Sequence, residues 1–134
     1  MHEWALADAI VAAVSSELAR SGASGVREVT VLLGELQAAD REILAFALRS
    51  LSKGTRIDPD AFRLETEQAA FTCGSCGREW GLDSGLTAEE REAIHFLPES
   101  AHAFIRCPFC GGADFSISRG RGVTLQRIQW KGLP

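Results

Sequence analysis

The sequence has no tyrosine, no cluster of lysine and arginine, and no apolar run long enough to cross a membrane. Its 14 basic and 18 acidic residues give a net charge of −4, and the basic residues form no stripe that would attract nucleic acid. The N-terminus lacks the basic region and apolar core of a secretory signal. These absences argue against a membrane, exported or nucleic-acid-binding protein, so we expect a cytoplasmic protein without nucleic-acid or membrane partners.

Common catalytic motifs are missing as well. The chain has no G-x-x-x-x-G-K-S/T phosphate-binding loop, no G-x-S-x-G nucleophile turn and no H-E-x-x-H metalloprotease helix. Its acidic residues are scattered along the faces of expected helices and strands, which indicates solvated charge. We therefore expect no enzymatic activity and no catalytic residue.

The remaining composition is that of a globular protein. A length of 134 residues with 46% hydrophobic and 24% charged residues fits one domain, or one domain with a small satellite. Two stretches carry apolar residues at every fourth position, which predicts two helices with one buried face each. These residues are Ile10, Val14 and Leu18 in the first stretch and Ile43, Ala47 and Leu51 in the second, where Leu44 and Leu48 form the adjacent row. Asp40 is the expected N-cap of the second helix, and Gly22 and Gly54 are expected near the helix ends.

Alternating apolar and polar residues predict strands near residues 26–33, 61–67 and 123–130. We expect these strands to form one small sheet covered by the two helices, which is an α+β fold. The expected division is a domain of residues 1–68 completed by residues 119–134, with residues 69–118 inserted as a metal-binding subdomain.

Four cysteines carry the strongest chemical signal. They stand as two C-x-x-C-G motifs at Cys73/Cys76 and Cys107/Cys110, with residues 77–106 between the pairs. Each C-x-x-C turn directs two sulfurs toward one point, and the glycine that follows permits the positive φ with which the chain leaves such a turn. Two such turns complete the closed four-thiolate site of structural zinc, the zinc-ribbon type.

Cysteine pairs of this kind also have other uses. A redox dithiol needs one C-x-x-C at a strand-to-helix junction, whereas here two copies match each other. Two disulfides conflict with a cytoplasmic location. A rubredoxin-like iron centre uses a similar double turn, so an electron-transfer protein stays as an alternative to zinc, as does a zinc-ribbon module for protein interaction.

The second residue is a histidine, directly before the first expected helix. The terminal amine, the His2 imidazole, and the backbone nitrogens of His2 and Glu3 place four potential ligand nitrogens within three residues. A nitrogen-rich square-planar set suits Ni(II) or Cu(II) better than zinc. The simpler interpretation is an exposed tail histidine, with Glu3 as a favourable charge at a helix N-terminus.

The expected insertion contains a further helix and two histidines. Thr87 and Glu90 fit a capping box, and Pro98 should end the helix just before Leu97. His95 therefore lies near a helix end, in a segment that the metal site would tie down. No feature of the sequence around His102 indicates a metal ligand, so we expect an ordinary packed or surface histidine there.

Taken together, these features resemble the HypA/HybF family of nickel metallochaperones for [NiFe]-hydrogenase maturation, and archaeal members in particular. The resemblance covers nearly the whole chain in order. It rests on Met1–Ala7, Leu33–Leu36, the two cysteine pairs and Ile94–Glu99.

The resemblance implies several roles. His2 would be the essential nickel ligand, joined by the backbone nitrogens of His2 and Glu3 and, as in archaeal relatives, by His95. The four cysteines would hold structural Zn²⁺. The implied partners are a HypB-type GTPase or ATPase and the large subunit of [NiFe]-hydrogenase, to which Ni²⁺ is delivered.

Overall fold

The computed structural model describes residues 2–37, 39–82 and 86–133. The chain divides into two compact units. The first, here called the helix–sheet unit, comprises Met1–Leu32, Ala39–Glu65 and Thr124–Pro134; the second, the cysteine unit, comprises Leu33–Ala38 and Thr66–Val123. Among the described residues, none of the helices combines the length and apolar character that a membrane crossing needs.

Two helices form one part of the helix–sheet unit. The first, α1 (Glu3–Ser21), buries Ala7, Ile10, Val14 and Leu18, which confirms the expected apolar stripe. It ends at Gly22, whose φ of 74° is left-handed and therefore suits a residue without a Cβ atom. The second, α2 (Arg41–Ser52), packs against α1 and buries Leu44, Ala47 and Leu48. The expected burial of Ile43 is wrong, because its side chain is 44% exposed.

The start of α2 follows the expected capping pattern. The Asp40 side chain accepts hydrogen bonds from the amides of Glu42 and Ile43, at 3.0 and 3.1 Å. It thereby satisfies two amides that have no acceptor inside the helix. Gly54, just beyond the helix, has the expected positive φ of 77°.

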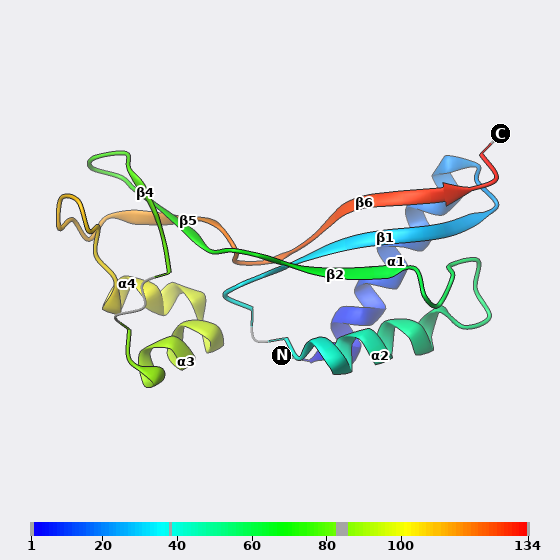
Figure 1. Ribbon diagram of the computed structural model, residues 1–134, viewed down its shortest axis with the longest axis horizontal. Coiled ribbons are helices and arrows are strands. Elements are labelled where there is room, and N and C mark those ends of the chain that lie inside the picture. The colour runs from blue at the N-terminus through cyan, green and yellow to red at the C-terminus, as the bar shows by residue number, and fades with distance from the viewer. Residues whose placement is uncertain (1, 38, 83–85, 134) are drawn as a thin grey trace. The chain divides into compact units, whose positions relative to one another are not determined.

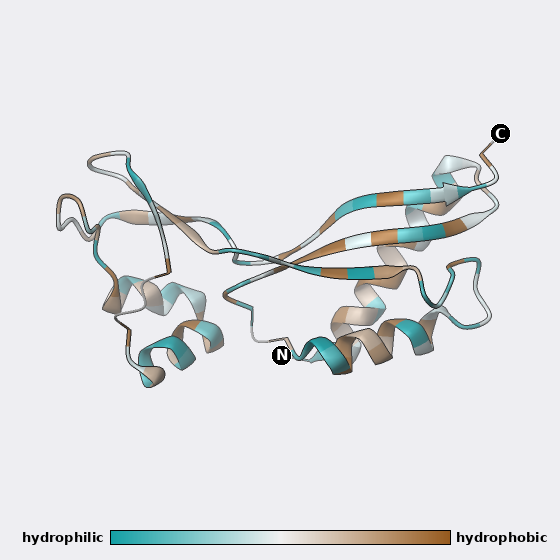
Figure 2. Cartoon of the chain, viewed as in Figure 1, coloured by the Kyte–Doolittle hydropathy of each residue, from teal (hydrophilic) through white to brown (hydrophobic). Residues whose placement is uncertain are grey.

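A three-stranded sheet completes this unit. The central strand β1 (Gly25–Gly34) lies between β2 (Phe62–Glu67) and β6 (Val123–Lys131), as Figure 1 shows. Hydrophobic and hydrophilic residues largely alternate along β2 and β6 (Figure 2), as strands with one buried face require, whereas the central strand β1 is buried at most positions. Val29 and Val31 of β1 are fully buried. The three-stranded sheet with two helices confirms the expected α+β class.

The cysteine unit has its own sheet and helices. Its strands β3 (Ala70–Cys73), β4 (Glu79–Gly81) and β5 (Phe115–Arg119) form an antiparallel sheet in the order β4-β3-β5. The helical elements are α3 (Ala88–Phe96), a 3₁₀ turn η1 (Pro98–Ser100) and α4 (Ala101–Phe104). The capping box of Thr87 and Glu90 is present, and Leu97 has the extended backbone expected before proline.

Aromatic side chains build the core of the cysteine unit. Phe71 is fully buried, and its ring centroid lies 5.8 Å from that of Trp80 and 5.5 Å from that of Phe115. Leu36 and Ile94 join this core without any exposed surface. The packed cluster positions β3 and β5, and these strands lead into and out of the two cysteine motifs.

Two carboxylates are used inside the cysteine unit rather than in solvent. The Glu35 side chain accepts a hydrogen bond from the amide of Ala69 at 2.6 Å, and that of Glu67 accepts one from Gly120 at 2.9 Å. The expectation that acidic residues are solvated charge is therefore wrong for this pair. These carboxylates satisfy backbone amides where three chain segments meet. The segments are so close that a side chain at Gly34 would not fit, because its Cβ atom would lie 2.2 Å from the Gly120 carbonyl oxygen.

Candidate metal centres

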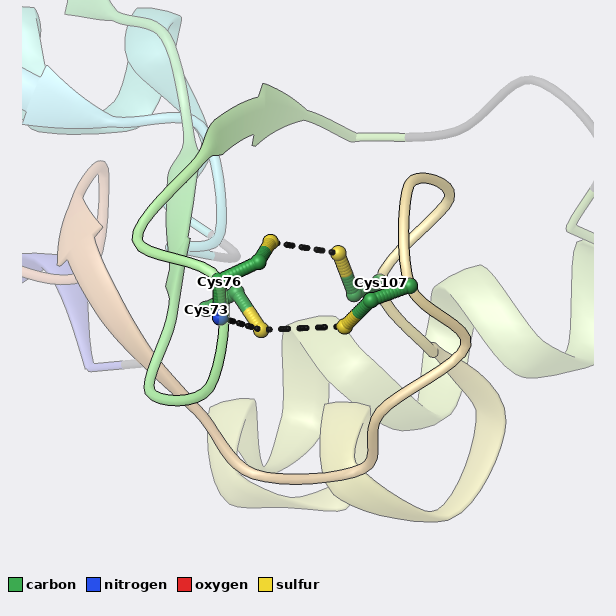
Figure 3. A group of neighbouring side chains, drawn as sticks. Cys73, Cys76 and Cys107 are labelled. Carbon is green, nitrogen blue, oxygen red and sulfur yellow. Dashed lines mark hydrogen bonds between the residues drawn. The ribbon is translucent and has the colours of Figure 1, made fainter.

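The four cysteine side chains converge on one point within the cysteine unit. Their sulfur atoms all lie within 4.8 Å of one another (Figure 3). Sulfurs of opposite motifs pair at 3.6 Å, Cys73 with Cys110 and Cys76 with Cys107. A set of ligand atoms this compact can surround a single metal ion.

The backbone prepares this arrangement. Gly77 and Gly111, which follow the second cysteine of each motif, have positive φ values of 77° and 73°. The amides of Ser75 and Cys76 point at the Cys73 sulfur, at 3.3 and 3.4 Å. Amides directed at a sulfur stabilise its anionic form, which is the form that binds metal.

The thiols differ in their ease of ionisation. Hydrogen bonds from the amides of Cys76 and Ser75 lower the pKa of Cys73 to about 6. Burial acts to raise the pKa of Cys107, but the amides of Cys110 and Phe109 outweigh it and leave that pKa below its ordinary value. At Cys110 the amide of Gly112 acts to lower the pKa, yet the sulfurs of Cys73 and Cys107 raise it to about 11.

The raised pKa of Cys110 reflects the crowding of sulfur atoms in the cluster. Four neighbouring sulfurs cannot all become anions at neutral pH unless a cation offsets their repulsion. A divalent ion with four thiolate ligands removes the conflict, and a closed four-sulfur set is the donor chemistry of structural zinc. The residues present therefore fit Zn²⁺.

The N-terminal histidine lies at the start of α1. His2 is the N-cap residue, with an extended backbone (φ −88°, ψ 94°), and its exposed imidazole makes no capping hydrogen bond within the described chain. The first hydrogen bond of the helix runs from the amide of Leu6 to the His2 carbonyl, at 3.0 Å. The amides that precede Leu6 therefore have no acceptor inside the helix.

Glu3 is held by its side chain. Its carboxylate accepts a hydrogen bond from the amide of Asp40 at 3.1 Å, which joins the starts of α1 and α2. The Asp40 amide is the main reason that the pKa of Glu3 lies below its ordinary value, and the amide of Glu3 itself contributes. Sequence patterns did not reveal this contact, because it joins residues from different helices.

The two other histidines both belong to the cysteine unit. His95 lies in the last turn of α3, as expected, and is partly exposed. His102 lies in α4 and stacks on Phe115, with ring centroids 4.3 Å apart. The stacking gives His102 the packing role of an ordinary histidine, as expected from the sequence. Within the described parts of the chain, the cysteine cluster is the one group of three or more metal-ligating side chains.

Sequence comparison relates nearly the whole chain to one family. A family model described as hydrogenase/urease nickel incorporation, metallochaperone, hypA matches residues 1–130. The hydrogenase maturation factor HypA of Pyrococcus horikoshii is 47% identical over 132 residues, which cover 96% of this chain and 95% of that protein. The factor of the same name from Methanothermobacter thermautotrophicus is 36% identical over 129 residues, or 96% of each chain.

Structural comparison identifies the same fold. The solution structure of the nickel metallochaperone HypA from Helicobacter pylori superimposes with a TM-score of 0.66 and covers 98% of this chain and 99% of its own. A second solution structure, of a HypA protein, gives a TM-score of 0.62 and covers 97% of this chain and 96% of its own. Sequence identities of 16% and 17% limit these two likenesses to the fold.

Proposed function

Because this chain belongs to the HypA family of nickel metallochaperones, we propose that it carries Ni²⁺ on a site built around His2 and delivers it for [NiFe]-hydrogenase maturation. A metallochaperone binds and transfers a metal ion without changing it chemically, so the protein is a carrier and not an enzyme. The nickel ion is its cargo.

One observation carries the proposal of the site. The exposed imidazole of His2, which makes no capping hydrogen bond within the described chain, stands next to backbone amides that have no carbonyl acceptor inside α1. Imidazole and backbone nitrogens form the nitrogen-rich set that Ni²⁺ accepts in a square-planar arrangement. The proposed ligands on this side are the His2 imidazole and the backbone nitrogens of His2 and Glu3.

The start of a helix is electropositive and would by itself repel a cation. Square-planar nickel can displace the proton of an amide and bind the nitrogen as an anion, which offsets that repulsion. The Glu3 carboxylate, which accepts a hydrogen bond from the Asp40 amide, adds negative charge at the start of α1, and the Asp40 carboxylate does so at the start of α2. Binding through deprotonated amides also makes the site sensitive to acid, because protons compete for the same nitrogens.

Two further metal assignments belong to the proposal. Cys73, Cys76, Cys107 and Cys110 hold one structural Zn²⁺, which links the two cysteine motifs and supports the small core beside them. His95 is proposed as an additional nickel ligand. Its support is the family resemblance of Ile94–Glu99 together with its partial exposure at the end of α3.

The partners follow from the maturation pathway. We propose a HypB-type GTPase or ATPase as the protein that works with this carrier, and the [NiFe]-hydrogenase large subunit as the recipient. The cytoplasmic location expected from the sequence is kept as part of this proposal. An exchangeable site suits such a carrier, because a recipient must take the nickel from it.

Nickel transfer tests the function directly. Zinc-loaded protein is given one equivalent of Ni²⁺ and freed of unbound metal. It is then mixed with purified apo large subunit that carries an affinity tag, so that the two proteins can be separated afterwards. We expect nickel to move to the large subunit while zinc stays behind. Failure to retain nickel before mixing, or zinc moving with it, would contradict the proposal.

The iron alternative is distinguished by metal analysis and colour. A ferric thiolate centre is red, whereas zinc thiolate absorbs no visible light. Elemental analysis of protein purified without added metal should find zinc, and a red protein containing iron would favour electron transfer instead.

A further inference from the structure

The cysteine unit contains a cavity of about 260 Å³ that neither proposed metal site uses. It lies between the end of β4 and the segment that joins α4 to the second cysteine motif. Small-molecule sites usually measure about 300–1,000 Å³, so this cavity suits a single large side chain better than a separate ligand. Its walls include Trp80, Gly81, Leu86, Phe104, Arg106 and Pro108.

Arg106 supplies the charge of this cavity. The other wall residues are apolar, whereas the exposed guanidinium of Arg106 has no hydrogen-bond or ion-pair partner among the described residues. The arginine of β5 differs in this respect, since Arg119 forms an ion pair with Glu79 at 2.8 Å. An unpaired guanidinium beside apolar walls is complementary to a carboxylate attached to an apolar group.

Among the described residues, no strand pairs with the outer side of the backbone next to the cavity. In the sheet order β4-β3-β5, the strand β4 is at an edge. The amide of Cys73 donates to the carbonyl of Arg78 at 2.9 Å, and Trp80 is opposite Phe71 in the same register. Because antiparallel pairing alternates, the backbone groups of Trp80 face β3 and those of Gly81 face away from it. Gly81 therefore presents a donor and an acceptor at the rim of the cavity.

We propose that this cavity and the β4 edge bind an extended segment of a partner protein. The segment would pair with the backbone of β4, insert one bulky apolar side chain between Trp80 and Phe104, and present a carboxylate to Arg106. Side chains two positions apart in a strand lie on the same face, so the apolar and acidic residues of the segment are spaced by one. Strand addition at a sheet edge with pockets for alternate side chains is a general mode of peptide recognition.

The test uses the zinc-loaded full chain labelled with ¹⁵N and an acetylated, amidated peptide, Thr-Val-Phe-Thr-Asp-Thr. Two matched peptides replace phenylalanine by serine or aspartate by asparagine. We expect the first peptide to shift the amide signals of residues 79–82 and 104–108 in a saturable manner. Each replacement should weaken binding by about tenfold, since each removes one of the two anchors.

A protein variant provides the complementary arm. Arg106→Gln should lower the affinity for the first peptide by about tenfold and leave the affinity for the asparagine peptide unchanged. Arg56→Gln, a change at an exposed arginine of the helix–sheet unit, should have no effect. Zinc content and the spectrum of each variant show that the fold is retained.

Three results would overturn the inference. The first is that the amide signals of residues 79–82 do not shift at about millimolar peptide, and the second is that signals shift only in other regions. The third is that the native chain and Arg106→Gln bind the first peptide with equal affinity. None of these results depends on nickel binding, so failure here is distinguishable from failure of the carrier function.

Discussion

The carboxylate of Glu3 accepts a hydrogen bond from the backbone amide of Asp40, at 3.1 Å. This bond joins the first turn of α1, next to His2, to the N-cap of α2, where Asp40 in turn binds the amides of Glu42 and Ile43. The side chain of Glu3, next to the proposed nickel ligand His2, is thus held by the N-cap residue of a second helix. The proposed nickel contact of Glu3 is its backbone nitrogen and not this carboxylate.

The first prediction separates these two roles of Glu3. Replacement by alanine keeps the backbone nitrogen but removes the bond to Asp40. We expect nickel affinity to fall only about 2- to 10-fold, the range of one lost hydrogen bond. Calorimetric titration measures the change, and Glu42→Ala, an exposed acid in the first turn of α2, is the matched control. A loss as complete as that of a direct ligand would mean that the Glu3 carboxylate itself binds nickel.

The second prediction concerns the cysteine motifs. Cys76→Ser should abolish tight zinc binding and loosen the cysteine unit, because metal binding supplies much of the folding free energy of a core this small. The helices α1 and α2 should persist, since their buried residues pack within the other unit. Zinc analysis and amide spectra check this, with Ser75→Ala as the control. Unchanged signals for residues 94–118 after zinc loss would refute a structural role for the metal.

Much of this architecture follows from local sequence. The helices α1 and α2 were predictable because apolar residues recur at helical spacing, as Ile10, Val14 and Leu18 do in α1. In α2 the spacing predicted the helix, but its buried face is centred on Leu44 and Leu48 and leaves Ile43 exposed. The capping box of α3 and its end before Pro98 are equally local signals. The cysteine cluster was predictable because its two motifs match each other.

Other features depend on contacts that the sequence does not reveal. The strands β3 and β4 have four and three residues, too few for a readable alternation. Leu36 is fully buried in the core of the cysteine unit although it lies only two residues after the end of β1 in the chain. Glu35 and Glu67 look like surface acids until the Ala69 and Gly120 amides that they bind are located.

The third prediction is an order of metal release with acidification. Protons compete with nickel for imidazole and amide nitrogens, so acidification weakens nickel binding. Nickel should therefore dissociate at a higher pH than zinc, which is held by four thiolates. Metal analysis after gel filtration at stepped pH values measures both ions. Zinc leaving before nickel would contradict the assignment of ligands.

The fourth prediction addresses His95. Nickel should slow hydrogen exchange of Ile94–Glu99, and His95→Ala should weaken nickel binding less than His2→Ala does. The reason is that His2 chelates together with adjacent backbone nitrogens, whereas His95 adds one independent bond. His102→Ala is the control, because His102 belongs to the same unit but stacks on Phe115. Full nickel affinity in His95→Ala, with unchanged exchange of residues 94–99, would make His95 an ordinary surface histidine.

The most direct test of the carrier function is a nickel titration of His2→Ala. The exposed His2 side chain makes no capping hydrogen bond within the described chain, so its loss should leave zinc content and folding unchanged. We predict that the nickel affinity of the variant falls by at least about 100-fold, because the imidazole and the backbone nitrogens beside it bind as one chelate. A native-like nickel affinity in His2→Ala, measured on zinc-loaded and folded protein, would contradict the central claim.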